Sequence, residues 1–147
     1  MAYSLEEGQP ALTPPECTIQ IINENLDRIR WDNHCDLASI TANTSKATTA
    51  YERANRFGKR RNTVIIGGIR AAVLRNEAKE HADSVVMGEA GNSWLLLLEA
   101  FKHNKLKLFY NQKRVIGLCL SMIPRYHLLK RENYKAICVQ TTRTVPP

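Results

Sequence analysis

The sequence lacks the features that define several classes of protein. It has four cysteines in 147 residues and no CxxC pair, so we expect neither a disulfide framework nor a structural zinc site. The longest unbroken apolar run covers only residues 94–98, far short of the roughly 18 to 20 residues that span a bilayer. Seven glycines and six prolines are too few for a collagen-like or wholly disordered chain.

Signals for secretion and for catalysis are also missing. The first ten residues contain two glutamates, no basic residue and no apolar core, so we expect an intracellular chain, either cytoplasmic or nuclear. There is no GxSxG, HExxH, paired-carboxylate or nucleotide-binding pattern, so we predict that the protein is not an enzyme. We assign no catalytic residue, no metal site and no cofactor.

Basic residues, in contrast, are abundant and unevenly distributed. The formal net charge is +7 and the pI is about 9.4. Residues 53–75 contain seven basic side chains and no acidic one, while segments 1–52 and 76–101 are net acidic. Residues 102–135 form a second basic block. If folding brings the two basic blocks together, they form a positive surface that attracts phosphates and releases their counterions.

This charge pattern predicts a non-enzymatic protein that binds RNA or DNA through phosphate contacts, without reading sequence. We also expect a homo-oligomer that contacts no membrane and has no small-molecule substrate. The predicted nucleic-acid contacts are Arg53, Arg56, Lys59, Arg60, Arg61, Arg70, Arg75, Lys102, Lys105, Lys107, Lys113 and Arg114.

Two consecutive glycines suggest a separate anion site. Gly67 and Gly68 lie between a β-branched run and a helical pattern, where free backbone amides can receive a phosphate. The alternative is that the glycines permit close packing of the backbone.

Hydrophobic periodicity in the first half of the chain predicts helices. The pattern at Thr13 to Glu16 resembles a capping box and begins a helix that extends to about residue 30. A second helix has a seam of small residues from Leu37 to Ala54. We expect residues 1–12 to be a flexible arm and residues 13–147 to form a single compact domain.

The second half combines helical and strand patterns. The run Thr63 to Ile66 predicts a short strand before a third helix, and Asn92 or Ser93 begins a fourth. Residues 105–123 alternate like a hairpin, and residues 134–142 form another strand-like run. The predicted fold is therefore α+β, with about four helices followed by a small C-terminal antiparallel sheet. The alternative is an all-α bundle in which 105–123 is one helix.

Two other functions are compatible with the residues. One is a coat-like or accessory assembly protein, of viral origin for example, which contacts partners through the Leu37 to Ala54 seam and a sheet edge. The other is a thiol enzyme that pairs Cys119 or Cys138 with His127. The sequence favours nucleic-acid binding over both because of its charge.

Overall fold

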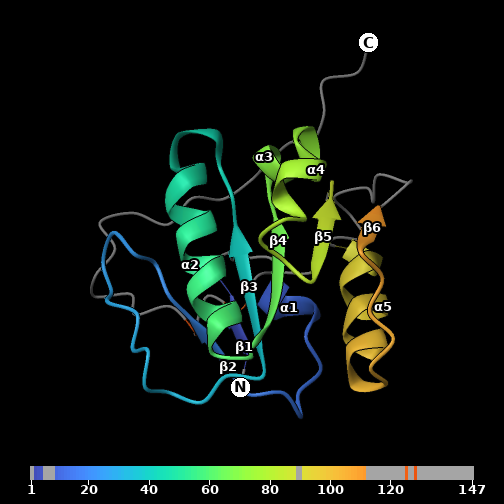
Figure 1. Ribbon diagram of the computed structural model, residues 1–147. Coiled ribbons are helices and arrows are strands. Elements are labelled where there is room, and N and C mark those ends of the chain that lie inside the picture. The colour runs from blue at the N-terminus through green and yellow to red at the C-terminus, as the bar shows by residue number, and fades with distance from the viewer. Residues whose placement is uncertain (1, 5–8, 89–90, 112–124, 126–127, 129–147) are drawn as a thin grey trace.

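Parallel strands form the centre of the molecule (Figure 1). We describe a computed structural model, which defines residues 2–4, 9–88, 91–111, 125 and 128. All neighbouring strands in its six-stranded sheet pair in parallel, in the order β2-β1-β3-β4-β5-β6. The strands are β1 (Ala2–Ser4), β2 (Ile19–Ile21), β3 (Leu37–Thr41), β4 (Thr63–Gly67), β5 (Ser84–Met87) and β6 (Phe109–Asn111).

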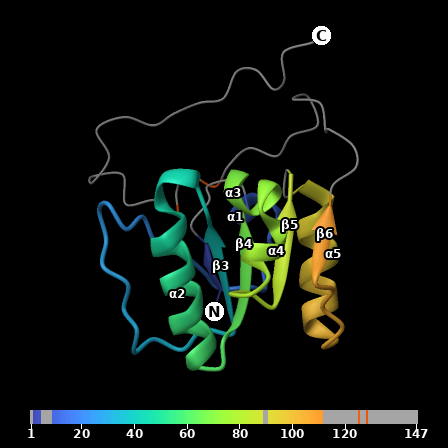
Figure 2. The ribbon, with the colours of Figure 1, turned by 45° about the horizontal axis from the view of Figure 1, so that its top comes forward.

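Helices cover both faces of this sheet (Figures 1 and 2). Helices α2, α3 and α4 lie on one face, and α1 and α5 lie on the other. The helices are α1 (Gln9–Leu12), the 3₁₀ turn η1 (Thr44–Lys46), α2 (Ala47–Lys59), α3 (Ile69–Val73), α4 (Arg75–Ala78) and α5 (Gly91–Lys102).

The core consists of two apolar layers, one on each side of the sheet. In β4, Val64 and Ile66 pack against the α2 side, while Ile65 packs with Trp94 and Leu97 of α5. These side chains are at most 1% exposed. Burial on both faces explains why β4 is a continuous apolar run instead of an alternating one.

The predicted α+β fold and its all-α alternative are both wrong, because strands and helices alternate along the chain. Strand β6 pairs in parallel with β5, where Val85 lies opposite Phe109, so residues 109–111 do not begin an antiparallel sheet. The rest of the predicted hairpin and the run 134–142 lie outside the described residues.

The first predicted helix is also wrong. Ile19–Ile21 forms β2, and the Leu37 end of the second predicted helix forms β3. The predicted strand at Thr63 and the helix beginning near Asn92 are confirmed as β4 and α5. Within the segment predicted as an arm, the structure places β1 and α1. The single-domain boundary at residue 13 stays a prediction.

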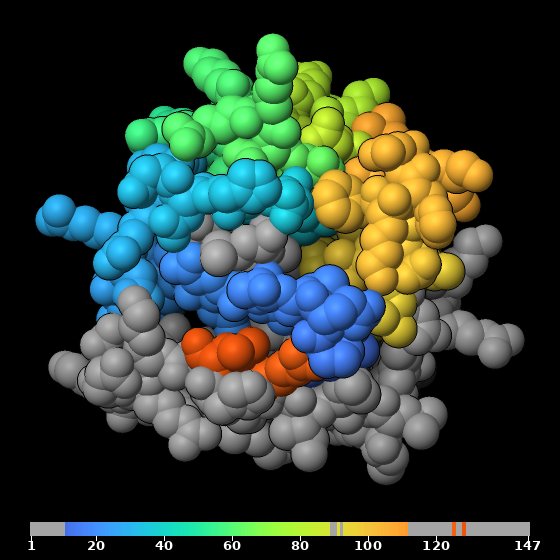
Figure 3. All heavy atoms as spheres, turned by 90° about the horizontal axis from the view of Figure 1, so that it is seen from below, coloured from blue at the N-terminus to red at the C-terminus, as the bar shows by residue number. Residues whose placement is uncertain are grey.

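At the amino ends of the strands, the segment after α1 lies beside α5 (Figure 3). Lys102, the last residue of α5, forms an ion pair with Glu16 at 3.3 Å. Arg125 donates a hydrogen bond to the Thr13 carbonyl at 3.0 Å.

Nowhere in the described ranges is a helix long and apolar enough to cross a bilayer.

Candidate functional site

The best candidate site lies at the carboxyl ends of the strands. Neighbouring strands β1 and β3 are followed by helices on opposite faces of the sheet, α1 behind and α2 in front (Figure 1). In parallel α/β proteins, ligands bind in the crevice outside the carboxyl ends, at the point where the connections diverge in this way.

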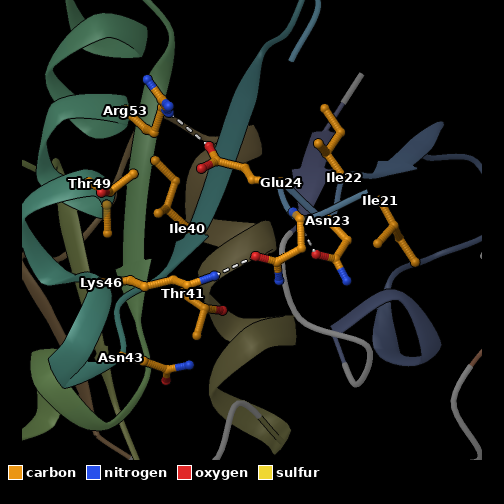
Figure 4. A pocket seen from close by; sticks show the side chains of 12 residues that line it. Ile21, Ile22, Asn23, Glu24, Ile40, Thr41, Asn43, Lys46, Thr49 and Arg53 are labelled. Carbon is orange, nitrogen blue, oxygen red and sulfur yellow. Dashed lines mark hydrogen bonds and ion pairs between the residues drawn. The ribbon is translucent and has the colours of Figure 1, made fainter. Parts of the chain in front are cut away.

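A hollow of about 180 Å³ is located at this edge (Figure 4). It is formed by the segment after β2, the end of β3 and the first turns of α2. Its apolar lining includes Ile22 and Ile40. Its polar lining consists of Asn23, Glu24, Asn25, Thr41, Asn43, Lys46, Thr49 and Arg53.

Two polar contacts tie the segment after β2 to α2 and its first turn (Figure 4). Arg53 Nε donates to Glu24 Oε1 at 2.8 Å. Lys46 Nζ donates to Asn25 Oδ1 at 2.7 Å. The first cation therefore has a carboxylate partner, whereas the second has a neutral amide.

An aromatic contact holds the same loop farther along α2. The Arg56 guanidinium lies 3.9 Å from the centroid of the Trp31 ring, and the rings of Trp31 and Phe57 are 5.0 Å apart. Cation–π and tilted aromatic contacts of this kind stabilise a loop that has no regular structure of its own. The segment after β2, which forms one side of the hollow, is therefore held against α2 both near Glu24 and at Trp31.

Gly68 brings the neighbouring loop close to the hollow. Its φ is +93°, and a Cβ atom there would lie 2.9 Å from the Ala42 carbonyl oxygen and 3.0 Å from Thr41 Cγ2. Ala42 N also donates to the Gly67 carbonyl at 2.9 Å. This close approach explains why a glycine occupies position 68. Anion binding by Gly67 and Gly68 stays a prediction.

Exposed apolar side chains lie beside the hollow, on α3. Ile69 and Val73 are 70% and 73% exposed, and Leu74 is partly exposed. Arg70 N, in the first turn of α3, donates to the carbonyl of Ala42 at 3.0 Å, and Ala42 directly follows Thr41 of the hollow's lining. The carboxyl edge therefore combines an apolar helix surface with an adjacent polar hollow.

A polar cluster joins α2 to α3 and α4. Arg70 donates to both carboxylate oxygens of Glu77, at 3.1 and 3.2 Å, and the Tyr51 ring stacks on His81 with centroids 4.5 Å apart. The Arg70 guanidinium lowers the pKa of Glu77, while burial raises the pKa of the Tyr51 hydroxyl. These contacts fix the helices that flank the edge.

Of the predicted nucleic-acid contacts, those that the structure describes do not gather on one surface. Lys59, Arg60 and Arg61 lie at the end of α2 and just beyond it, and Lys105 and Lys107 follow α5, so both groups are near the amino edge. By contrast, Arg70 and Arg75 lie on α3 and α4, which follow the carboxyl end of β4.

Several of these predicted contacts already have partners. Arg53, Arg70 and Lys102 form ion pairs with carboxylates, and Arg56 lies on Trp31. Lys113 and Arg114 lie outside the described residues, as do Cys119, His127 and Cys138. Among the residues that are described, no three His, Cys, Asp or Glu side chains are grouped to hold a metal ion.

Sequence reasoning missed the polar residues of the hollow, notably Asn25, Asn43 and Lys46. The available signal was their position directly after two short apolar runs, Ile19 to Ile22 and Leu37 to Ala42. That signal has meaning only if both runs are parallel strands, because only then do the segments after them meet at one edge.

The fold and site define a doubly wound parallel α/β protein with a hollow at the carboxyl edge of its sheet. The sequence is 42% identical over 104 residues to bacteriochlorophyllide d C-8(2)-methyltransferase of Chlorobaculum tepidum, a match covering 70% of this chain and 23% of that enzyme. It is 33% identical over 75 residues to bacteriochlorophyllide d C-12(1)-methyltransferase of the same organism, covering 51% of this chain and 16% of that enzyme.

The chain therefore matches less than a quarter of the length of these relatives. No model of a known protein family matches it. No solved structure matches it either.

These similarities correct the functional predictions. Both relatives are methyltransferases named for a bacteriochlorophyllide, so the predictions of a non-enzymatic protein, of RNA or DNA as partner and of a viral or assembly role are wrong, while the homo-oligomer stays a prediction. The prediction of no small-molecule substrate is wrong for the same reason. Net charge alone predicts attraction to anions in general and does not specify a partner.

Proposed function

We propose that this chain is a tetrapyrrole-binding α/β unit of a methyltransferase that acts on a bacteriochlorophyllide-type macrocycle. The observation that carries the proposal is the 42% identity over 104 residues to the C-8(2)-methyltransferase. The similarity to the C-12(1) enzyme supports the same substrate class, because the two relatives are named for different positions on one macrocycle.

The carboxyl edge suits a tetrapyrrole in shape and polarity. Such a macrocycle is a broad apolar disc with polar groups at its rim. A hollow of about 180 Å³ is too small for the disc but admits a group from its rim. The exposed side chains of Ile69 and Val73 offer an apolar surface on which the disc can rest outside the hollow.

The function assigned to this unit is to bind and orient the macrocycle. Methyl transfer to a particular carbon requires that carbon to be held near the methyl donor in a fixed direction, and such positioning lowers the barrier to reaction. A rigid parallel sheet whose edge loops are tied together, as by the Ala42 to Gly67 hydrogen bond, provides the fixed frame.

Titration of the 147-residue chain with bacteriochlorophyllide d, followed by the absorption bands of the macrocycle, tests the proposal. We expect a saturable spectral shift, and no saturable binding of an RNA oligonucleotide in a parallel titration. Absence of any saturable shift up to the solubility limit of the pigment would overturn the proposal.

A pair of variants tests whether the α3 surface is the contact. Val73→Asp places a charge on the proposed resting surface and is expected to weaken binding at least about tenfold, since burial of a valine side chain contributes on the order of 1.5 kcal/mol or more. Leu96→Asp is the matched control, because Leu96 is 65% exposed on α5, on the other face of the sheet. Equal loss in both variants would contradict the assignment of the surface.

A further inference from the structure

The segment after β2 packs differently in its two halves. It covers residues 22–36 and contains turns but no helix or strand. In its second half, Ile29 and Trp31 pack against the apolar core on the α2 side of the sheet. In its first half, residues 23–27 contain one apolar residue, Leu26, which is 42% exposed. This turn of residues 23–27, which we call the flap, is therefore not held in place by apolar burial.

Two polar side-chain contacts join the flap to α2 and to η1 (Figure 4). Arg53 Nε donates to Glu24 Oε1 at 2.8 Å, and Lys46 Nζ donates to Asn25 Oδ1 at 2.7 Å. The side chains of Glu24 and Arg53 remain 28% and 34% exposed. The backbone hydrogen bonds described for the flap stay within it, so they do not tie it to α2.

The chain on either side of the flap is fixed more firmly. Ile22, directly before it, is 3% exposed and belongs to the apolar core. After it, Trp31 lies 3.9 Å from the Arg56 guanidinium and 5.0 Å from the Phe57 ring. Exposed ion pairs contribute little to stability and are screened by salt, whereas apolar burial is the main stabilising contribution. The flap is therefore the part of this segment that separates most readily from α2.

The flap also forms one side of the hollow. Residues 23–25 line it, and Lys46, Thr49 and Arg53 line it from the α2 side (Figure 4). Movement of the flap away from α2 would widen this hollow of about 180 Å³ and uncover its apolar lining at Ile22 and Ile40. The position of the flap therefore determines access to the hollow.

We propose that the flap opens and closes the hollow, with Ile22 and Ile29 as its pivots and the ion pair of Glu24 with Arg53 as its latch. Such a flap admits a ligand larger than the closed hollow, and closure then shields the bound part from water. The inference concerns a movement of the chain itself, so it holds whichever ligand the hollow binds and does not depend on the proposed function.

Proteolysis of the folded 147-residue chain tests the flap. A glutamate-specific protease cleaves after Glu24 only when the flap has left α2, so the cleavage rate follows the open population. Arg53→Gln removes the charge of the latch and should speed this cleavage about two- to fivefold, the factor typical of losing an exposed ion pair. Arg53→Lys, which keeps the charge, should stay close to the rate of the unmodified chain.

Lys102→Gln is the matched control, because it removes another exposed ion pair, with Glu16 at the amino edge. It should leave the rate of cleavage after Glu24 unchanged. Cleavage after Trp31 by chymotrypsin should also be unchanged in Arg53→Gln, because Trp31 lies beyond the pivot.

Three results would overturn the flap. The first is an unchanged rate of cleavage after Glu24 in Arg53→Gln. The second is equal acceleration after Glu24 and after Trp31 in that variant, which would show loosening of the whole segment. The third is an acceleration in Lys102→Gln as large as that in Arg53→Gln, which would show a general loss of stability.

Discussion

At the scale of single residues, Gly68 determines how closely the loops after β3 and β4 approach each other. Its positive φ is strained for any residue with a Cβ, and the space beside it is already occupied by Ala42 and Thr41. Gly58, in contrast, lies within α2 with no atom in the way of a Cβ. The two glycines should therefore respond to substitution in opposite directions.

We expect Gly68→Val to lower the free energy of unfolding by about 2 to 4 kcal/mol, because it combines backbone strain with a clash against a carbonyl oxygen. Gly58→Ala should raise it by up to about 1 kcal/mol, because alanine favours the helix. Urea denaturation followed by circular dichroism measures both. A Gly68→Val protein as stable as the unmodified chain would show that the two loops do not pack as described.

The Arg70 to Glu77 ion pair predicts how stability depends on pH. Arg70, and secondarily Tyr51, lowers the pKa of Glu77 below its ordinary value of 4.5. A carboxyl group with a lowered pKa in the folded state stabilises the fold above its unfolded pKa, and this contribution is lost as the pH falls through the folded pKa. Stability should therefore decrease on acidification below about pH 4.5.

Glu77→Gln removes this titration, so the stability of the variant should fall less steeply below that pH. Urea midpoints measured between pH 6 and pH 3 provide the comparison. Glu80→Gln, a substitution at an exposed residue just after α4, is the control and should retain the slope of the unmodified chain. Equal slopes in all three proteins would contradict the role given to the ion pair.

At the scale of elements, the strands explain what the sequence could and could not predict. Strand β4 was predictable because four β-branched residues are followed directly by two glycines. Strand β2 has only three residues, and Ile19 and Ile22 happen to fit a helical period with Leu26. With β2 and β3 assigned to helices, no parallel edge existed in the prediction, and so the hollow could not be found.

Helix α5 gives a direct test of the second apolar layer. Leu97 is fully buried against the sheet, while its neighbour Leu96 is 65% exposed. Leu97→Ala should lower the free energy of unfolding by about 2 to 5 kcal/mol through lost burial and the cavity left behind. Leu96→Ala should change it by less than about 0.5 kcal/mol, as is usual for surface positions. If the two substitutions lowered the free energy of unfolding equally, α5 would not have Leu97 facing the sheet and Leu96 facing the solvent.

At the scale of the whole molecule, folding brings basic and acidic segments together, so the charge blocks along the sequence do not correspond to charged surfaces. Segments that are basic or acidic along the sequence meet in space, as Arg53 does with Glu24 and Lys102 with Glu16. Linear charge blocks cannot show these pairings, because the partners are separated by 29 and 86 residues. The functional assignment therefore depends on the edge of the sheet and on the methyltransferase relatives, and net charge contributes little to it.

The location of the tetrapyrrole on the molecule tests the central claim most directly. The measurement is an amide NMR spectrum of the isotope-labelled chain with increasing bacteriochlorophyllide d, since the ring current of the macrocycle shifts nearby resonances strongly. We predict the largest shifts at residues 41–46 and 68–74, at the carboxyl edge. Shifts concentrated at residues 59–61 and 102–107, at the amino edge, would contradict the account.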